Sequence, residues 1–124
     1  MASWTQHSRI QIGKYVKLGE DKESVILLHL MYNNTTDKNF ACQVEFIHPS
    51  KPKTVELARI DRSHGFQHLD KLWKKEPDKE EFYREMNPWE AAEYLQENWI
   101  SYFKKWSNRD DTEISRPYEL IDID

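Results

Sequence analysis

The stretch from residue 59 to residue 70 holds the densest group of side chains that could do chemistry. It contains two histidines, two aspartates and two arginines within twelve residues. A histidine, with an ordinary pKa of about 6.5, can give and take a proton near neutral pH, and a carboxylate can orient its ring. The stretch therefore predicts an acid–base site, with His64 and His68 as acid and base and with Asp61 or Asp70 orienting a ring.

The spacing of the two histidines leaves their geometry open. His64 is followed directly by Gly65, and His68 comes four residues after His64. A helical turn would place both rings on one face. A sharp turn at Gly65 would aim them differently. Either geometry can bring two imidazoles and a carboxylate together.

Three interpretations of this cluster follow from its residue types. Two histidines can cleave RNA without a metal, using the 2′-hydroxyl as internal nucleophile, while Arg59, Arg62 and Lys71 hold the phosphate. The histidines and one aspartate could instead bind a divalent metal, but their spacing matches no dedicated motif such as His-Glu-x-x-His. We therefore expect no metal and no other cofactor. Alternatively, the histidines cap turns, and Asp61 pairs with a neighbouring arginine at the surface.

The cluster also carries a resemblance. The run from Ala58 to Asp70 contains Arg-x-Asp-x-x-His-Gly-x-x-His-x-Asp, and residues 91–99 read Ala-Ala-Glu-Tyr-Leu-Gln-Glu-Asn-Trp. This combination resembles small uncharacterised prokaryotic proteins, some of which are similar to the TumE-like toxins of toxin–antitoxin pairs. The resemblance covers residues 10–106 by layout and implies RNA as substrate and an antitoxin-like protein partner. The site that it implies consists of Arg59, Asp61, His64, His68 and Asp70.

Charge is unevenly distributed along the chain, whose formal net charge is −4. Residues 107–124 carry six acidic and two basic side chains, whereas residues 51–75 carry seven basic and three acidic ones. An acidic chain is not built for tight non-specific binding of nucleic acid, but a local basic face can still hold RNA.

Cysteine content and hydropathy exclude several protein classes. The single Cys42 rules out an intramolecular disulfide and a cysteine-cluster metal site, and it lies in an apolar run as a small buried hydrophobe. The chain shows no basic region followed by an apolar run at its start, and its longest apolar run, Val25–Leu28, is far shorter than a membrane span. We expect a soluble cytoplasmic protein with no membrane contact. Nothing in the sequence predicts its oligomeric state.

Hydrophobic periodicity predicts the strands that must position the cluster. Alternating or continuous apolar residues indicate four strands, with a bulge or phase change at Gly13 in the first. Short connections favour an antiparallel meander. The predicted strands cover residues 9–18, 24–32, 40–47 and 54–60.

Helical signals follow the strands. Residues 76–85 begin with a proline and acids, which predicts a short helix. Asn87, Pro88 and Glu90 then form an N-terminal capping pattern for a long amphipathic helix that ends at Trp106. Its aromatic face has a helical period and is expected to cover the sheet rather than to stack on bases. The fold class is therefore α+β: an antiparallel sheet of about four strands, a short helix, and a long C-terminal helix packed on the sheet.

The remaining segments complete the expected organisation. Residues 1–106 form a single α+β domain, and residues 107–124 form an acidic, flexible tail whose weak alternation could instead add an edge strand. His29 and His48 are expected to be structural, and His7 to lie in a mobile end.

The sequence supports three functions. The first is a toxin-like domain that binds or processes RNA and, if it is an enzyme, is a metal-independent ribonuclease. The second is a non-catalytic protein–protein interaction module that uses a sheet edge or the acidic tail. The third is a metal-dependent hydrolase.

Overall fold

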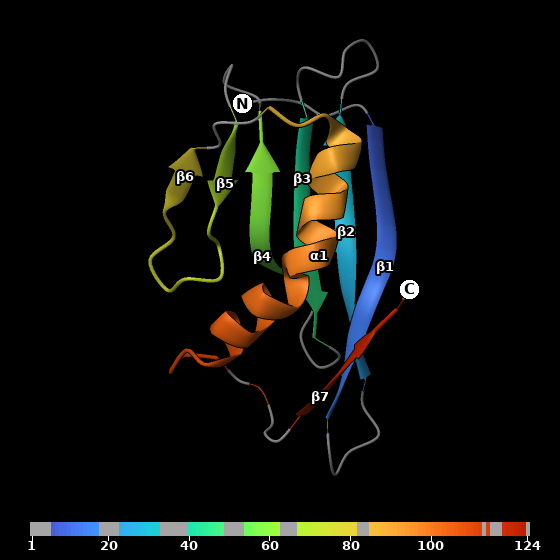
Figure 1. Cartoon of the computed structure of the whole chain (residues 1–124). Coiled ribbons are helices and arrows are strands. Elements are labelled where there is room, and N and C mark those ends of the chain that lie inside the picture. The colour runs from blue at the N-terminus through green and yellow to red at the C-terminus, as the bar shows by residue number, and fades with distance from the viewer. Residues whose placement is uncertain are drawn as a thin grey trace.

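The described residues form a seven-stranded antiparallel sheet with one helix against it (Figure 1). The computed structural model describes residues 6–17, 23–32, 40–48, 54–62, 67–81, 85–112, 114 and 118–123. The strands are β1 (Gln6–Lys17), β2 (Glu23–Tyr32), β3 (Phe40–Ile47), β4 (Thr54–Asp61), β5 (His68–Asp70), β6 (Lys79–Glu81) and β7 (Tyr118–Asp122), and the helix is α1 (Pro88–Ser107).

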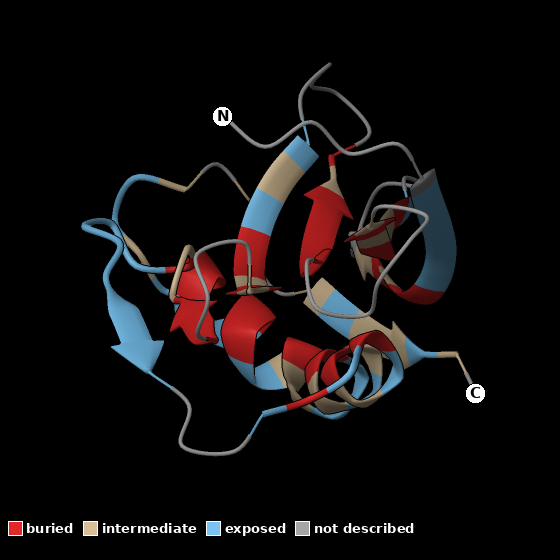
Figure 2. Cartoon of the chain, turned by 90° about the horizontal axis from the view of Figure 1, so that it is seen from above, coloured by how far each residue is buried: buried red, intermediate tan, exposed pale blue. Residues whose placement is uncertain are grey.

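The order of the strands is β6-β5-β4-β3-β2-β1-β7. From β1 to β6 each strand pairs with its neighbour in the sequence, as in a meander, and only β7 pairs with a strand far away in the chain. The sheet curls into a half-barrel, and α1 lies against one of its faces (Figures 1 and 2).

The predicted number of strands and helices was wrong. The four predicted strands belong to the sheet, but β5, β6 and β7 extend it, and the described residues contain one helix. The segment 76–85, predicted to be a short helix, contains β6, whose three residues are all charged and exposed. Such a strand forms because its backbone pairs with β5, and its side chains carry no hydrophobic pattern that would reveal it.

β7 lies within the segment that was predicted to be a flexible tail. It pairs with β1 from Gly13 to Lys17, so it closes one side of the sheet. The Tyr118 ring packs edge-on against Tyr15 and Phe103, and its hydroxyl lies 2.6 Å from Ser107 Oγ at the end of α1. The weak alternation at the end of the chain is therefore that of an edge strand.

α1 begins at the predicted capping box and buries most of the predicted aromatic stripe, although Trp89 in its first turn is 67% exposed. Asn87 Oδ1 accepts a hydrogen bond from the Glu90 backbone N–H at 2.9 Å, and the Glu90 carboxylate accepts one from the Asn87 backbone N–H. The buried side of the helix carries Leu95, Trp99 and Phe103, each without exposed surface (Figure 2). In the part of the chain that the structure describes, no helix has both the length and the apolar character needed to cross a membrane.

A bulge in β1 lets the helix approach the sheet. The register between β1 and β2 shifts between Gln11 and Gly13, which confirms the phase change predicted at Gly13. The Trp99 ring packs directly on Gly13, where any side chain would overlap with it. Ile12, the residue left out of the pairing, is buried in the core.

Candidate functional site

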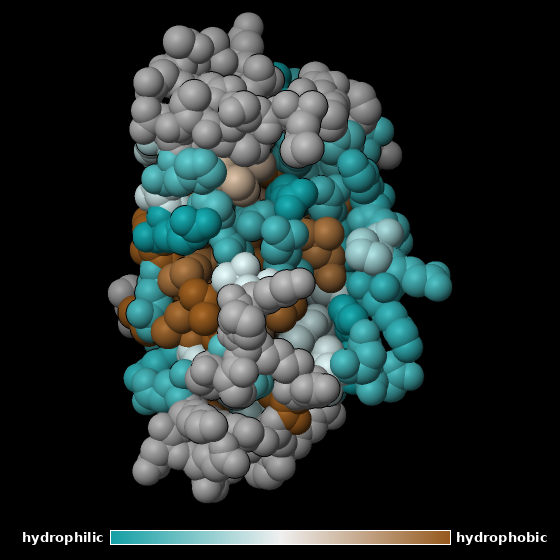
Figure 3. Space-filling model, turned by 180° about the vertical axis from the view of Figure 1, so that it is seen from behind, coloured by the Kyte–Doolittle hydropathy of each residue, from teal (hydrophilic) through white to brown (hydrophobic). Residues whose placement is uncertain are grey.

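Polar side chains gather on the face of the sheet opposite α1, which we call the back face (Figure 3). Successive side chains of a strand point to opposite faces. Because Phe46 packs against α1 through Phe103 and Trp106, Gln43 and Glu45 of the same strand belong to the back face. Hydrophobic side chains share this face, mainly on the side of β1 and β2 (Figure 3).

One line of polar residues crosses six strands on the back face. Each member lies opposite the next in the pairing of neighbouring strands. We call this line the cross-strand row; it consists of Arg9, His29, Gln43, Arg59, Asp70 and Lys79. Although α1 does not cover this face, three of the six are nearly buried, with 4% of His29, 5% of Gln43 and 7% of Asp70 exposed. Neighbouring side chains therefore remove most water from the centre of the row.

The structure brings together four of the predicted site residues. Asp61 lies opposite His68 in the pairing of β4 with β5, and Arg59 lies opposite Asp70. All four belong to the back face, and His68 and Asp70 are buried. His64 lies outside the described residues.

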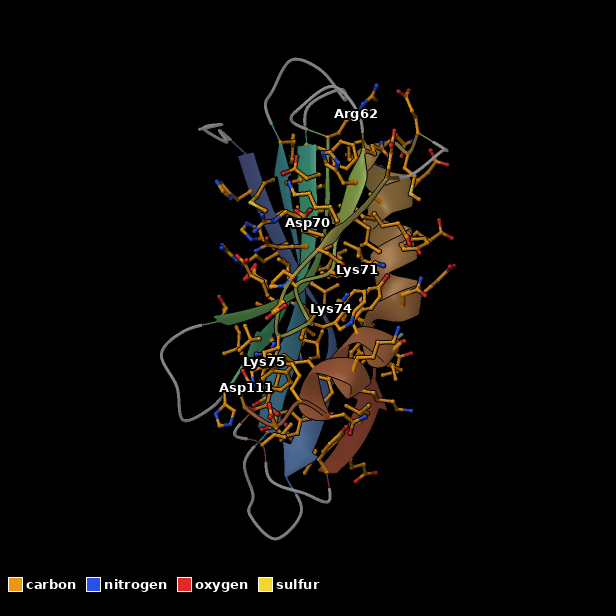
Figure 4. All side chains as sticks on the ribbon, turned by 90° about the vertical axis from the view of Figure 1, so that its left-hand side faces the viewer. Arg62, Asp70, Lys71, Lys74, Lys75 and Asp111 are labelled. Atoms are coloured by element: carbon orange, nitrogen blue, oxygen red, sulfur yellow. The ribbon has the colours of Figure 1, made fainter. Side chains whose placement is uncertain are left out.

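The two remaining predicted site residues lie on the other side of the sheet. The side chain of Arg62 donates a hydrogen bond to Glu85 Oε1 at 3.0 Å, and Lys71 Nζ lies 3.4 Å from Glu80 Oε1. Figure 4 shows Lys71 on the α1 side of Asp70. The reason is the alternation of a strand, which turns residues next to Asp61 and Asp70 toward the opposite face.

Arg59 is held by several partners. Its Nε donates a hydrogen bond to Gln43 Oε1 at 2.9 Å, and its Nη2 donates one to Glu56 Oε2 at 3.0 Å. Its Nη1 also lies 4.0 Å from Asp70 Oδ2. The guanidinium charge is thus shared among carboxylates of the protein, which leaves a weak field for a bound phosphate.

Carboxylates also balance the lysines along the edge formed by β5 and β6 (Figure 4). Lys74 Nζ lies 2.6 Å from Asp78 Oδ2, and its hydrogen bond lowers the pKa of the Asp78 carboxyl. Lys75 Nζ lies 3.0 Å from Asp110 Oδ1. The described cations of the predicted basic segment therefore have nearby carboxylates, so its formal charge overstates its attraction for a polyanion.

Three side chains on the back face form a chain that the sequence did not predict. His29 Nδ1 lies 2.6 Å from Glu45 Oε1, and His29 Nε2 lies 3.0 Å from His7 Nδ1. The sequence predicted His29 to be structural and His7 to lie in a mobile end, whereas His7 belongs to β1. The available signal was the polar pair Gln43 and Glu45 in an otherwise apolar strand, but only the strand register shows that they meet a histidine.

Burial and the Glu45 charge act in opposite directions on the pKa of His29. Burial lowers the pKa of His29, the Glu45 carboxylate raises it, and Arg9 lowers it, with a net result below the ordinary value. The described residues contain no group of three or more histidine, cysteine or acidic side chains arranged to hold a metal ion. What the back face does supply is paired acid–base groups in a region with little water.

Comparison with known proteins gives one match. No curated protein and no solved structure matches the chain. A family model described as a domain of unknown function, DUF7718, matches residues 8–112. This range contains six of the seven strands for most or all of their length, and all of α1. The chain therefore belongs to the DUF7718 family.

Proposed function

We propose that this protein is an interaction module that binds an extended segment of a partner protein as an added strand beside β1. The observation that carries the proposal is a half-covered edge. β7 pairs with β1 only from Gly13 to Lys17, and the Ile123 backbone N–H donates to Ile12 O at 3.3 Å. Among the described residues, no strand pairs with the outer edge of Gln6–Gln11, which we call the free segment of β1 (Figure 1). Its backbone groups are a template for main-chain hydrogen bonds.

Two exposed hydrophobic side chains support this proposal. Ile10 of the free segment is 57% exposed and Trp89 of α1 is 67% exposed; they are the large hydrophobic residues with the most exposed surface among those described. Trp89 precedes Phe103 by nearly a whole number of helical turns, so the two side chains leave α1 in similar directions. Phe103 contacts Tyr15 of β1. Figure 1 shows that α1 and β1 start at the same end of the sheet, and Trp89 and Ile10 are near the starts of these two elements. Exposed hydrophobic residues beside an unpaired edge are typical of a binding surface.

The opposite edge of the sheet has the properties of a protected edge. β6 has only three residues, all charged and exposed. Short, charged edge strands discourage pairing with another chain. The contrast points to the free segment of β1 as the edge that accepts a partner.

The side chains on the two faces of the free segment define the partner's chemistry. Ile10 belongs to the α1 side, because it lies opposite Leu28, whereas Arg9 belongs to the back face. The side chain of Arg9 is 53% exposed. An added strand would therefore place apolar side chains toward Ile10 and Trp89 and acidic side chains toward Arg9. We propose a partner segment that alternates apolar and acidic residues, as an antitoxin-like protein could supply.

Selection from a display library of random octapeptides tests this proposal. Enriched peptides are expected to alternate apolar and acidic residues, and replacing Ile10 with lysine or Trp89 with alanine should weaken binding of the best synthetic peptide about tenfold or more. Glu81→Lys on β6 is the matched control and should leave affinity unchanged. N-methylation of alternate peptide bonds should abolish binding, because it removes main-chain donors.

Two results would overturn strand addition. One is the absence of any enriched peptide. The other is binding that tolerates N-methylation and the Ile10 and Trp89 substitutions. A concentration-dependent dimer of the protein alone, lost in Ile10→Lys, would identify a second copy of this chain as the occupant instead.

We propose RNA processing as the second candidate function. It is supported by the two carboxylate pairings on the back face, His68 with Asp61 and Arg59 with Asp70, because a carboxylate can orient an imidazole for proton transfer. The charge balance around Arg59 makes this candidate weaker than strand addition.

Histidine NMR titration with and without a short RNA tests the second candidate. If it is correct, His68 shifts when RNA is added, and His68→Ala removes cleavage of the same RNA. A His68 signal that is unchanged by RNA, together with an RNA that stays intact, would contradict it.

A further inference from the structure

The chain of Glu45, His29 and His7 connects the interior of the sheet to its surface. Glu45 is 2% exposed and His29 is 4% exposed, whereas His7 is exposed. The three come from β3, β2 and β1, three neighbouring strands, so the sheet fixes their relative positions. A buried carboxylate is costly unless it has partners, and its nearest described partners are His29 and, at 3.7 Å, the Nε of Arg9.

The short contact to Glu45 assigns the tautomer of His29. His29 Nδ1 and Glu45 Oε1 lie only 2.6 Å apart, although the two buried atoms are not aligned as a hydrogen bond. A lone pair on Nδ1 would repel the carboxylate oxygen at this distance, so the proton of His29 belongs on Nδ1. In a neutral imidazole the other nitrogen, Nε2, then carries a lone pair. That lone pair accepts the Nδ1–H of His7, 3.0 Å away.

This order of hydrogen bonds leaves the lone pair of one His7 nitrogen available for reaction. If His7 donates through Nδ1, its Nε2 carries a lone pair at the exposed end of the chain. A proton taken up at His7 Nε2 can be followed by transfer of the Nδ1 proton to His29, where the Glu45 carboxylate lies next to the new charge. Histidine oriented by a carboxylate is the usual form of a general base.

The surroundings favour this arrangement over a fixed ion pair. The titratable and charged groups that face His29 are His7 and Arg9 from β1 and Glu45 from β3. Leu27 and Met31 flank His29 on the same face of β2 and limit its contact with water. Burial and the Arg9 charge oppose a lasting imidazolium at His29, whereas the Glu45 carboxylate favours one, so a proton that reaches His29 is passed back and Nε2 returns to being an acceptor.

We propose that Glu45, His29 and His7 form a proton relay, and that His7 Nε2 is a general base for a hydroxyl group or a water molecule of a ligand on the back face. This activity is independent of strand addition and needs no metal ion in the proton transfer. Residue charges indicate the class of ligand. On the back face of β3 to β6 the described carboxylates outnumber the described cations, which favours an uncharged or cationic hydroxyl compound over a polyanion. The carboxylates are Glu45, Glu56, Asp61, Asp70 and Glu81, and the cations are Arg59 and Lys79.

Two measurements on the full chain test the relay. The first is ¹⁵N-detected NMR of the histidine rings near pH 7. We expect neutral His29 with its proton on Nδ1, and a hydrogen bond from His7 Nδ1–H to His29 Nε2. The second is the rate at which diethyl pyrocarbonate modifies His7, measured by mass spectrometry. Glu45→Gln should slow this reaction about tenfold or more, because the carboxylate no longer fixes the tautomer of His29.

Glu56→Gln is the matched control. Glu56 is also a carboxylate of the back face, but its hydrogen bonds go to Gln43 and Arg59. In this variant, diethyl pyrocarbonate should modify His7 at the wild-type rate. His7→Ala provides a second test in case Glu45→Gln does not fold, because His7 is exposed; it should simplify the titration of His29 to a single step.

Three outcomes would overturn the relay. One is His29 found as an imidazolium at pH 7, which would make it a structural ion pair with Glu45. Another is a neutral His29 with its proton on Nε2. The third is a His7 modification rate that Glu45→Gln and Glu56→Gln change equally.

Discussion

Replacing Trp99 with alanine is expected to destabilise the fold by about 3–5 kcal/mol. Trp99 has no exposed surface and is among the largest fully buried side chains of the described residues. Its ring packs on Gly13, where the bulge in β1 makes room for it. Truncation removes a large buried apolar area and leaves a cavity that a rigid sheet cannot fill by moving. Urea unfolding followed by circular dichroism would measure the loss.

Trp89→Ala is the matched control for this prediction. Trp89 belongs to the same helix, but it is 67% exposed, so its removal should change the free energy of unfolding by about 0.5 kcal/mol or less. Equal effects of the two substitutions would contradict the packing of α1 on β1 through Trp99.

Replacing Gly13 with alanine should destabilise the fold by about 1–3 kcal/mol, because it overfills the same contact from the opposite side. An added Cβ would lie 2.7 Å from Cη2 of Trp99, and the indole ring is too rigid and too enclosed to move away easily. The free energy of unfolding from urea titration is again the measured quantity. Gln11→Ala, at an exposed position of the same strand, should cost less than 1 kcal/mol.

A double-mutant cycle connects these two predictions. In a Trp99→Leu background the smaller side chain makes room for the added methyl group, so Gly13→Ala should cost clearly less than in the wild type. If both backgrounds show the same cost, strain at the Trp99 contact is not the cause of the destabilisation.

The elements with strong local signals could be predicted from the sequence. β1 to β4 bury one or both faces, so their apolar residues alternate or run together. The capping box formed by Asn87 and Glu90 marks the start of α1, and the bulge at Gly13 interrupts the alternation of β1. In each case the information lies within a few residues of the feature.

The missed elements depend on pairing between distant segments. β5 is only three residues long, and β6 consists of Lys79, Glu80 and Glu81, which contain no hydrophobic pattern at all. Both exist because β4 offers backbone partners to the next strand. β7 depends on a contact with β1 from the other end of the chain.

The site shows the same division between local and distant information. Asp61 and His68 could be selected together because they are close in sequence. Arg62 and Lys71 were predicted to hold phosphate together with Arg59, but the extension of β4 to Asp61 and the existence of β5 decide on which side of the sheet they lie. The contact of His29 with Glu45 requires the register of the hairpin between β2 and β3, which no composition or spacing reveals.

The position of β7 affects how much of the outer edge of β1 is open to pairing. β1 to β6 assemble by closing short loops, whereas β7 must return across almost the whole chain to reach β1, which costs more loop entropy and slows its docking. Segments of this kind open more readily than the centre of a sheet. When β7 detaches, Gly13–Lys17 joins the free segment, and the whole outer edge of β1 becomes one continuous template. A long incoming strand would then compete with β7 for the same hydrogen bonds, so strand displacement would favour long partners over short ones.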